Sequence, residues 1–144
     1  SLAGALLAPT RIYVKPLLNR LRDFRVNGMV HITGGGFAGN VPRILPKGVR
    51  ARIDVSSWPR PPIFGVLQRH GEIADSEMLR VFNCGIGMVL VVPREQVDDI
   101  QQRLQSLGER SYRIGEIERK APEDPPLLFG PLSTPSASPA AHVR

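Results

Sequence analysis

Apolar residues in the first half of the chain recur with two different periods. From Ala5 to Phe24 they follow one another mostly at steps of three and four residues, which predicts an amphipathic helix. Residues 28–33 form a short β-rich run bounded by glycine, which is typical of a buried strand. Residues 37–45 have the spacing of a short helix, and in residues 49–55 apolar and charged side chains alternate, which predicts a half-buried strand.

The second half continues the alternation of helices and strands. A proline-rich connector ends at Pro62, and two short helices are predicted over residues 63–71 and 76–83. Residues 85–92 form the clearest buried strand, residues 94–107 carry one apolar helical face, and Tyr112, Ile114 and Ile117 belong to a last strand. The order α, β, α, β, α, α, β, α, β predicts an α/β (α+β) sandwich with helices packed on a sheet.

The composition sets limits on the class of protein. A chain of 144 residues is enough for one domain, which we expect over residues 1–120. Residues 121–144 are expected to be a linker and a disordered Pro/Ser/Ala-rich tail, because they have few large apolar residues to offset the ordering entropy. One Cys excludes an internal disulfide framework, and no apolar run reaches the length of a membrane span. A cytoplasmic protein with no membrane partner is expected.

The charge favours anionic ligands without identifying one. Lys and Arg number 19 against 13 Asp and Glu, a net charge of +6. These basic residues are dispersed and have no aromatic residues interleaved with them, whereas nucleic-acid surfaces normally combine a basic stripe with a reading helix or exposed aromatics. The sequence therefore favours a small phosphate-bearing ligand, and no nucleic-acid partner is expected.

One local motif carries chemistry, the glycine cluster in His31-Ile32-Thr33-Gly34-Gly35-Gly36-Phe37. Glycines between a strand and a helix start let several backbone N–H groups approach an anion. The Thr33 hydroxyl could add a donor, and Asn40 and Arg43 could flank the same site. The cluster has neither the Walker nor the Rossmann spacing, and it could equally be a tight turn that lets a helix pack close to a strand.

The other candidate residues give weaker signals. Cys84 and its neighbouring glycines precede a strand, so they indicate a bulge or close backbone approach rather than a thiolate nucleophile. His31 is predicted to lie on a buried strand, where a structural histidine and a ligand or acid/base role both remain open. His70 and His142 are assigned no function. The spacing of the residues identifies no catalytic group and no metal site.

Three motifs together resemble a known family. They are LLAPTRIYVK (residues 6–15), HITGGGFAGNVPRILP (residues 31–46) and EMLRVFNCGIGMVLVV (residues 77–92). They are similar to the C-terminal domain of phosphoribosylformylglycinamidine cyclo-ligase, also called aminoimidazole ribonucleotide synthetase. The resemblance extends from about Leu6 to about Ile117, with the elements in the same order.

The resemblance implies an ATP- and Mg²⁺-dependent enzyme of purine biosynthesis that closes the ring of formylglycinamidine ribonucleotide to give 5-aminoimidazole ribonucleotide. It implies a homodimer whose N-terminal domain supplies most of the ATP and Mg²⁺ contacts, so this chain alone is expected to be inactive. The implied phosphate- or substrate-binding residues are Thr33, Gly34, Gly35, Gly36 and Asn40. His31, Arg43 and Asn83 are implied to line the cleft between the two domains.

The resemblance also implies a ferredoxin-like fold that here lacks its first strand, so an unpaired sheet edge and association of the chain are expected. The chain departs from the family at Gly39-Asn40, where members usually carry Glu-Asn, so only Asn40 matches. Two alternatives remain open. One is a non-catalytic anion-binding or interaction module, and the other is a related ATP-dependent protein such as formylglycinamidine ribonucleotide amidotransferase or selenophosphate synthetase.

Overall fold

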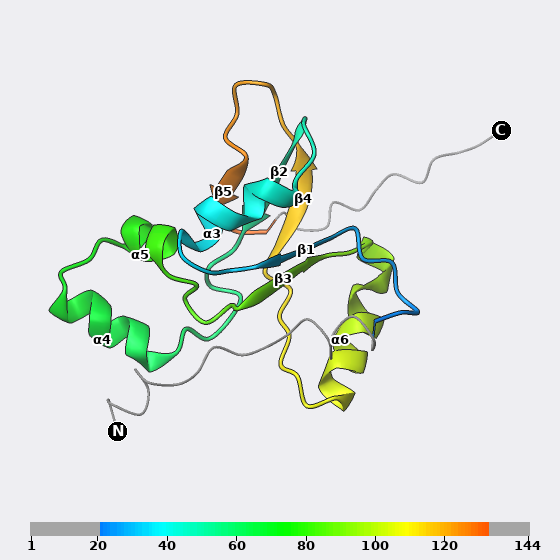
Figure 1. Cartoon of the computed structure of the whole chain (residues 1–144), viewed down its shortest axis with the longest axis horizontal. Helices are drawn as coiled ribbons and strands as arrows, with labels where there is room; N and C mark the ends of the chain where they lie inside the picture. Colours follow the sequence, from blue (N-terminus) through cyan, green and yellow to red (C-terminus); the bar gives the residue numbers. More distant parts are fainter. Residues whose placement is uncertain (1–20, 133–144) are drawn as a thin grey trace.

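Two β-sheets flanked by helices make up the part of the chain that the computed structural model describes, residues 21–132 (Figure 1). The helices are α3 (Gly36–Asn40), α4 (Pro62–His70), α5 (Asp75–Val81) and α6 (Val97–Ser106), with short 3₁₀ turns η1 (Val41–Ile44) and η2 (Arg94–Gln96). The strands are β1 (Gly28–His31), β2 (Val49–Ile53), β3 (Met88–Val91), β4 (Gly115–Arg119) and β5 (Leu127–Phe129). This arrangement confirms the predicted α/β class.

The first sheet pairs β1 with β3 in antiparallel register, with Met29 opposite Leu90 and Val30 opposite Val89. Side chains alternate between the two faces of a strand, so the two pairs point in opposite directions. Met29 and Leu90 pack on a small cluster around Ile100 of α6, while the two valines pack on the main core. Both faces of this sheet are therefore covered by apolar side chains.

The second sheet has the order β4-β2-β5, with β2 antiparallel to β4 and parallel to β5. Ala51 and Ile53 of β2 are buried on its inner face. On the outer face the Glu118 carboxylate accepts hydrogen bonds from Arg52 Nε (3.1 Å) and Arg50 Nε (2.6 Å). These bonds lower the pKa of Glu118, because they stabilise its charged form.

The main core fixes the short helix α3 in place. Phe37 is fully buried, and its ring lies 5.7 Å from that of Trp58 and 6.3 Å from that of Phe129, measured between centroids. Met78 of α5 is also fully buried in the same cluster. Because α3 begins directly after the glycine cluster, the burial of Phe37 anchors one end of that loop.

The structure confirms the predicted elements between residues 28 and 107 and corrects the ends. Residues 21–24 form a turn, in which Phe24 N donates to Leu21 O (3.0 Å), so the first predicted helix does not reach Phe24. The last predicted strand lies slightly later, as β4, and an unpredicted strand β5 follows it within the expected linker. Most of that first helix, and residues 133–144 of the expected tail, lie outside the described residues. Between residues 21 and 132, no helix is long and apolar enough to cross a membrane.

Candidate functional site

The glycine cluster forms a tight turn between β1 and α3. Gly35 and Gly36 have φ angles of +92° and +53°, in the left-handed region that side chains with a Cβ rarely adopt. The turn is closed by two backbone hydrogen bonds, from Gly36 N to Thr33 O (3.1 Å) and from Gly39 N to Gly35 O (2.8 Å). The predicted sharp turn at this position is therefore present.

The glycines of the turn have different surroundings. A Cβ on Gly36 would lie 2.3 Å from the carbonyl oxygen of Leu79, so α3 can approach α5 closely only because this residue is glycine. A Cβ on Gly34 would meet no atom within 4 Å, and Gly34 does not have a positive φ. Packing thus accounts for Gly36, whereas neither packing nor backbone conformation accounts for Gly34, which is exposed.

The buried side chain of Asn40 holds the turn in place through hydrogen bonds. Its side chain is 3% exposed, and its Nδ2 atom donates to the carbonyl oxygens of Gly36 (2.7 Å), Gly34 (3.3 Å) and Thr33 (3.4 Å). These bonds turn the three carbonyl groups toward Asn40. A buried amide with these partners orients the turn and does not face solvent.

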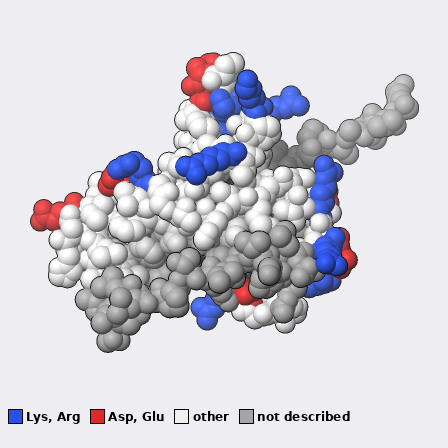
Figure 2. All heavy atoms as spheres, viewed as in Figure 1, with Lys and Arg blue, Asp and Glu red and all other residues white. Residues whose placement is uncertain are grey.

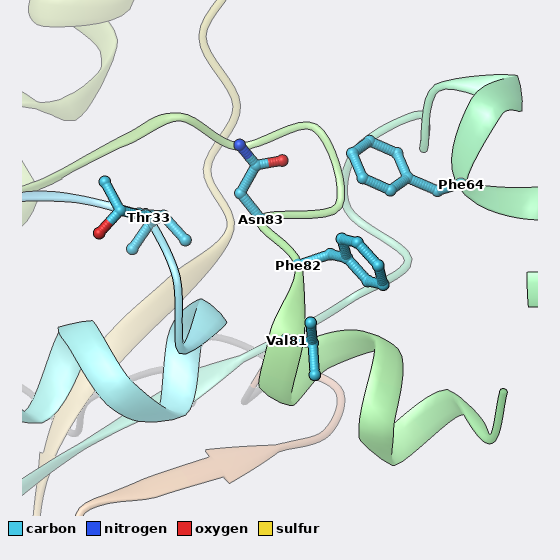
Figure 3. Close-up of a pocket in the computed structure, with 6 residues that line it drawn as sticks. Thr33, Phe64, Val81, Phe82 and Asn83 are labelled. Atoms are coloured by element: carbon cyan, nitrogen blue, oxygen red, sulfur yellow. The ribbon is translucent and has the colours of Figure 1, made fainter. Parts of the chain in front are cut away.

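A pocket of about 270 Å³ adjoins the turn (Figure 3). Its lining residues come from the end of β1, from α4 and from the end of α5: Ile32, Thr33, Phe64, Val81, Phe82 and Asn83. The Phe64 and Phe82 rings meet edge to face, 6.0 Å apart between centroids. Thr33 belongs to both the pocket and the glycine turn, so the two features form one continuous surface.

Asn83 presents a fixed amide to this pocket. Its Oδ1 atom accepts a hydrogen bond from Gly85 N (3.0 Å), which identifies the other end of the amide as the NH₂ group. Figure 3 shows that this nitrogen points away from the two phenyl rings. The Asn83 oxygen is therefore occupied, and its NH₂ group lies on the side of the pocket away from the phenyl rings.

Two other predicted site residues, His31 and Arg43, do not line the pocket. His31 ends β1 and is exposed, so the prediction of a buried histidine is wrong. Arg43 lies on η1, is exposed, and does not line the pocket. On the face drawn in Figure 2, basic side chains form separate groups, some beside acidic ones, as the dispersed charge in the sequence predicts.

The second glycine cluster, at Gly85 and Gly87, forms a turn that has no space for a side chain at Gly85. A Cβ on Gly85 would lie 2.4 Å from Pro61 Cδ, and Trp58 Nε1 donates to the carbonyl oxygen of Cys84 (3.0 Å). Cys84 is fully buried with a φ of +49°, and burial raises the pKa of its thiol. These contacts confirm the interpretation as a close backbone approach and disfavour a thiolate nucleophile.

The aromatic wall of the pocket, formed by Phe64 and Phe82, is not predicted by the sequence pattern. Phe64 and Phe82 sit at the start of α4 and just after α5, where single apolar residues in short helices read as core positions. Within residues 21–132, no group of three or more His, Cys, Asp or Glu side chains could hold a metal ion.

Known proteins match most of the chain. The family described as AIR synthase related protein, C-terminal domain, matches residues 2–124. A phosphoribosylformylglycinamidine cyclo-ligase of Geobacter metallireducens is 58% identical over 119 residues, which cover 83% of this chain and 34% of that protein. One from Nitrosospira multiformis is 54% identical over 129 residues, covering 90% of this chain and 37% of its own. The chain thus spans about a third of the length of these curated relatives.

A solved structure with a similar fold is the crystal structure of E. coli HypE, a hydrogenase maturation protein. The TM-score is 0.62 with 24% sequence identity, over 79% of this chain and 36% of that one. This likeness concerns the fold alone. The sequence relatives, in contrast, confirm the resemblance carried by the three motifs.

Proposed function

The chain belongs to the family of AIR synthase related proteins, as a C-terminal domain, and from this membership we propose that it forms the C-terminal part of a phosphoribosylformylglycinamidine cyclo-ligase. The observation that carries the proposal is the 58% identity to the Geobacter metallireducens enzyme across 83% of this chain. The same name recurs in a relative from Syntrophus aciditrophicus at 50% identity. This level of likeness favours the cyclo-ligase over a related ATP-dependent protein or a non-catalytic module.

The proposed reaction closes an imidazole ring. The formyl amide oxygen of formylglycinamidine ribonucleotide accepts a phosphoryl group from ATP. An amidine nitrogen of the same molecule then attacks the formyl carbon. A C–N bond forms, and phosphate leaves with the former formyl oxygen. The products are 5-aminoimidazole ribonucleotide, ADP and phosphate. Positioning and charge stabilisation account for most catalysis of phosphoryl transfer, so binding of the substrate's own phosphate contributes to the rate.

The glycine turn is the proposed site for the ribonucleotide phosphate. The exposed, sterically free backbone at Gly34 and the adjoining Thr33 hydroxyl support this role. Gly35 supplies the left-handed conformation that the turn needs, and Gly36 lets α3 approach α5. Asn40 is assigned a positioning role, because its buried amide donates to the turn rather than toward a ligand.

The remaining parts of the proposal concern the complete enzyme. We assign most of the ATP and Mg²⁺ contacts to its N-terminal domain. The described residues offer no cluster of metal ligands, so no step of the reaction is assigned to a metal held by them. His31, Arg43 and Asn83 are proposed to face the cleft between the domains, and of these Asn83 lines the pocket. We further propose a cytoplasmic homodimer with no nucleic-acid or membrane partner.

Two structural details are also proposals. In the complete enzyme, a preceding strand would extend the β1–β3 pair into a ferredoxin-like sheet. Two observations support this arrangement. The β1–β3 sheet has only two strands within residues 21–132, and apolar side chains cover both of its faces. We also propose that the C-terminal domain ends at residue 120. The strand β5 follows this boundary and pairs with β2 in the second sheet.

A chimaeric enzyme tests the proposed function directly. This chain would replace the matching C-terminal third of the Geobacter metallireducens cyclo-ligase, with the parent enzyme and the chain alone as controls. We expect ADP release that depends on formylglycinamidine ribonucleotide from the chimaera and from the parent, and none from the chain alone. A folded chimaera with no activity beside an active parent would contradict the proposal.

A further inference from the structure

We propose that the pocket beside the glycine turn holds a neutral nitrogen heterocycle, the ring of a ligand whose phosphate lies on that turn. This inference rests on the proposed phosphate role of the turn and adds what recognises the other end of the ligand. Two compounds of the proposed reaction carry such a ring, the aminoimidazole product and the adenine nucleotide. The pocket would thus determine specificity at a site that the glycine motif does not explain.

The apolar part of the lining favours a flat ring. Four of the six lining residues are Ile32, Phe64, Val81 and Phe82. The two phenyl rings stand edge to face, which gives a heterocycle both an edge and a face to pack against. Val81 remains 39% exposed, so covering it would remove apolar surface from water.

The polar part of the lining favours a neutral ring with a hydrogen-bond acceptor. The Asn83 amide is held by its oxygen on Gly85 N, which leaves its NH₂ group, on the side away from the phenyl rings, for a ligand atom that extends beyond those rings. The Thr33 hydroxyl can donate or accept. Neither Lys, Arg, Asp nor Glu lines the pocket, so it offers no partner for a charged group.

The pocket has room for a ring, and its position allows the rest of the ligand to lie on the glycine turn. Its volume of about 270 Å³ lies just below the range of about 300–1,000 Å³ for pockets that enclose drug-sized ligands, so a single ring has ample room. Ile32 and Thr33 lead from the pocket directly into the glycine turn. A ring in the pocket would therefore leave its ribose and phosphate outside, on the side of Gly34.

A factorial binding experiment separates the ring from the phosphate. Dissociation constants would be measured for this chain with 5-aminoimidazole ribonucleotide, its nucleoside, ribose 5-phosphate and ribose. AMP and adenosine form a second pair that distinguishes adenine from aminoimidazole. We expect a ring to tighten binding at least about tenfold over ribose 5-phosphate, equivalent to about 1.4 kcal/mol.

Two substitutions test whether the ring occupies this pocket. Asn83→Asp keeps the acceptor for Gly85 N and replaces the NH₂ donor with a negative charge. Val81→Ser removes apolar surface at a position that is 39% exposed, and Ile117→Ser on β4 is its matched control at 40%. Both pocket variants should reduce the benefit of the ring to less than about threefold, and the control should leave it unchanged.

The outcomes separate this inference from the proposed function. Equal binding of ribose 5-phosphate and both nucleotides would overturn the ring pocket and leave the phosphate role of the turn intact. Equal binding of nucleoside and nucleotide would overturn the phosphate role and leave the ring pocket standing. A ring benefit that persists in Asn83→Asp and Val81→Ser would place the ring elsewhere and overturn the inference, and absence of binding by every probe would overturn both.

Discussion

The two glycine-rich turns have similar compositions and opposite surroundings. The first, Thr33–Gly36, exposes Gly34 to open space on one side and rests on the Asn40 amide on the other. In the second, Cys84–Gly87, Pro61 occupies the space that a Cβ on Gly85 would need. The first turn leaves its backbone at Gly34 open for the ligand proposed above, whereas close packing around the second turn stabilises the fold.

The contrast teaches that a glycine is informative only together with what a Cβ would touch. Gly36 and Gly85 are both required by close neighbours, a carbonyl oxygen in one case and a proline ring in the other. Gly34 has neither a close neighbour nor a strained backbone. Neither of these two reasons for a glycine therefore applies to Gly34, whereas close packing accounts for the other two.

The largest expected effect comes from Gly36→Ala. The added Cβ would lie 2.3 Å from Leu79 O, a backbone atom, and the residue would keep a φ of +53°. We expect a loss of about 3 kcal/mol in the free energy of unfolding, because clash and strain combine. Urea denaturation followed by fluorescence of Trp58, the one tryptophan in the sequence, would measure it. A variant as stable as the parent would show that α3 can move away from α5 at no cost.

Gly85→Ala tests the second turn in the same way. The Cβ would lie 2.4 Å from Pro61 Cδ at a φ of +101°. We expect a loss of about 2 kcal/mol, smaller than for Gly36 because a ring atom can shift more easily than a helix backbone. Thermal unfolding of the two variants side by side checks the order. An unchanged melting temperature for Gly85→Ala would remove the contrast between a filled and an open turn.

Trp58→Phe removes a single anchor of the second turn. The substitution deletes the Nε1 donor and leaves the buried Cys84 carbonyl oxygen without that 3.0 Å hydrogen bond. A loss of about 1–2 kcal/mol is expected, from the unsatisfied carbonyl and the smaller ring. Circular dichroism would follow urea unfolding, since the fluorescent residue is gone. Unaltered stability would mean that the ring packs without help from its N–H group.

Gly34→Ala should affect binding and hardly affect stability. Its Cβ meets no atom within 4 Å, so the free energy of unfolding should change by less than about 0.5 kcal/mol. Binding of ribose 5-phosphate should weaken several-fold, because in the proposed phosphate site the added methyl group would stand where the phosphate approaches. Gly130→Ala is the matched control, with its nearest contact at 3.7 Å and no positive φ. Equal affinities for the two variants would exclude Gly34 from the phosphate site.

Sequence reasoning predicted those elements whose own residues determine them. The strand β3 lies in a continuous apolar run and the helix α6 carries one apolar face, and both appear where predicted. The strand β5 was missed because Leu127–Phe129 is three residues long and follows a proline-rich stretch that reads as a linker. It forms because β2 offers an edge for parallel pairing, which the local sequence does not encode.

The location of the glycine turn was predictable from the sequence, but the separate structural roles of its residues were not. The position of the turn after β1 follows from the glycine pattern alone. That Gly36 serves packing depends on Leu79, and that Asn40 orients the turn depends on where three carbonyl groups point. These are contacts between residues distant in the chain or between backbone groups, and no periodicity reveals them.

The most direct test of the difference between the turns is a titration of the ¹⁵N-labelled chain with ribose 5-phosphate, followed by the backbone amide shifts of its glycines. The account predicts saturable shifts at Gly34 and Gly35, with Gly85 and Gly87 unmoved. Shifts at Gly85 and Gly87 without any at Gly34 would contradict the assignment of phosphate binding to the first turn.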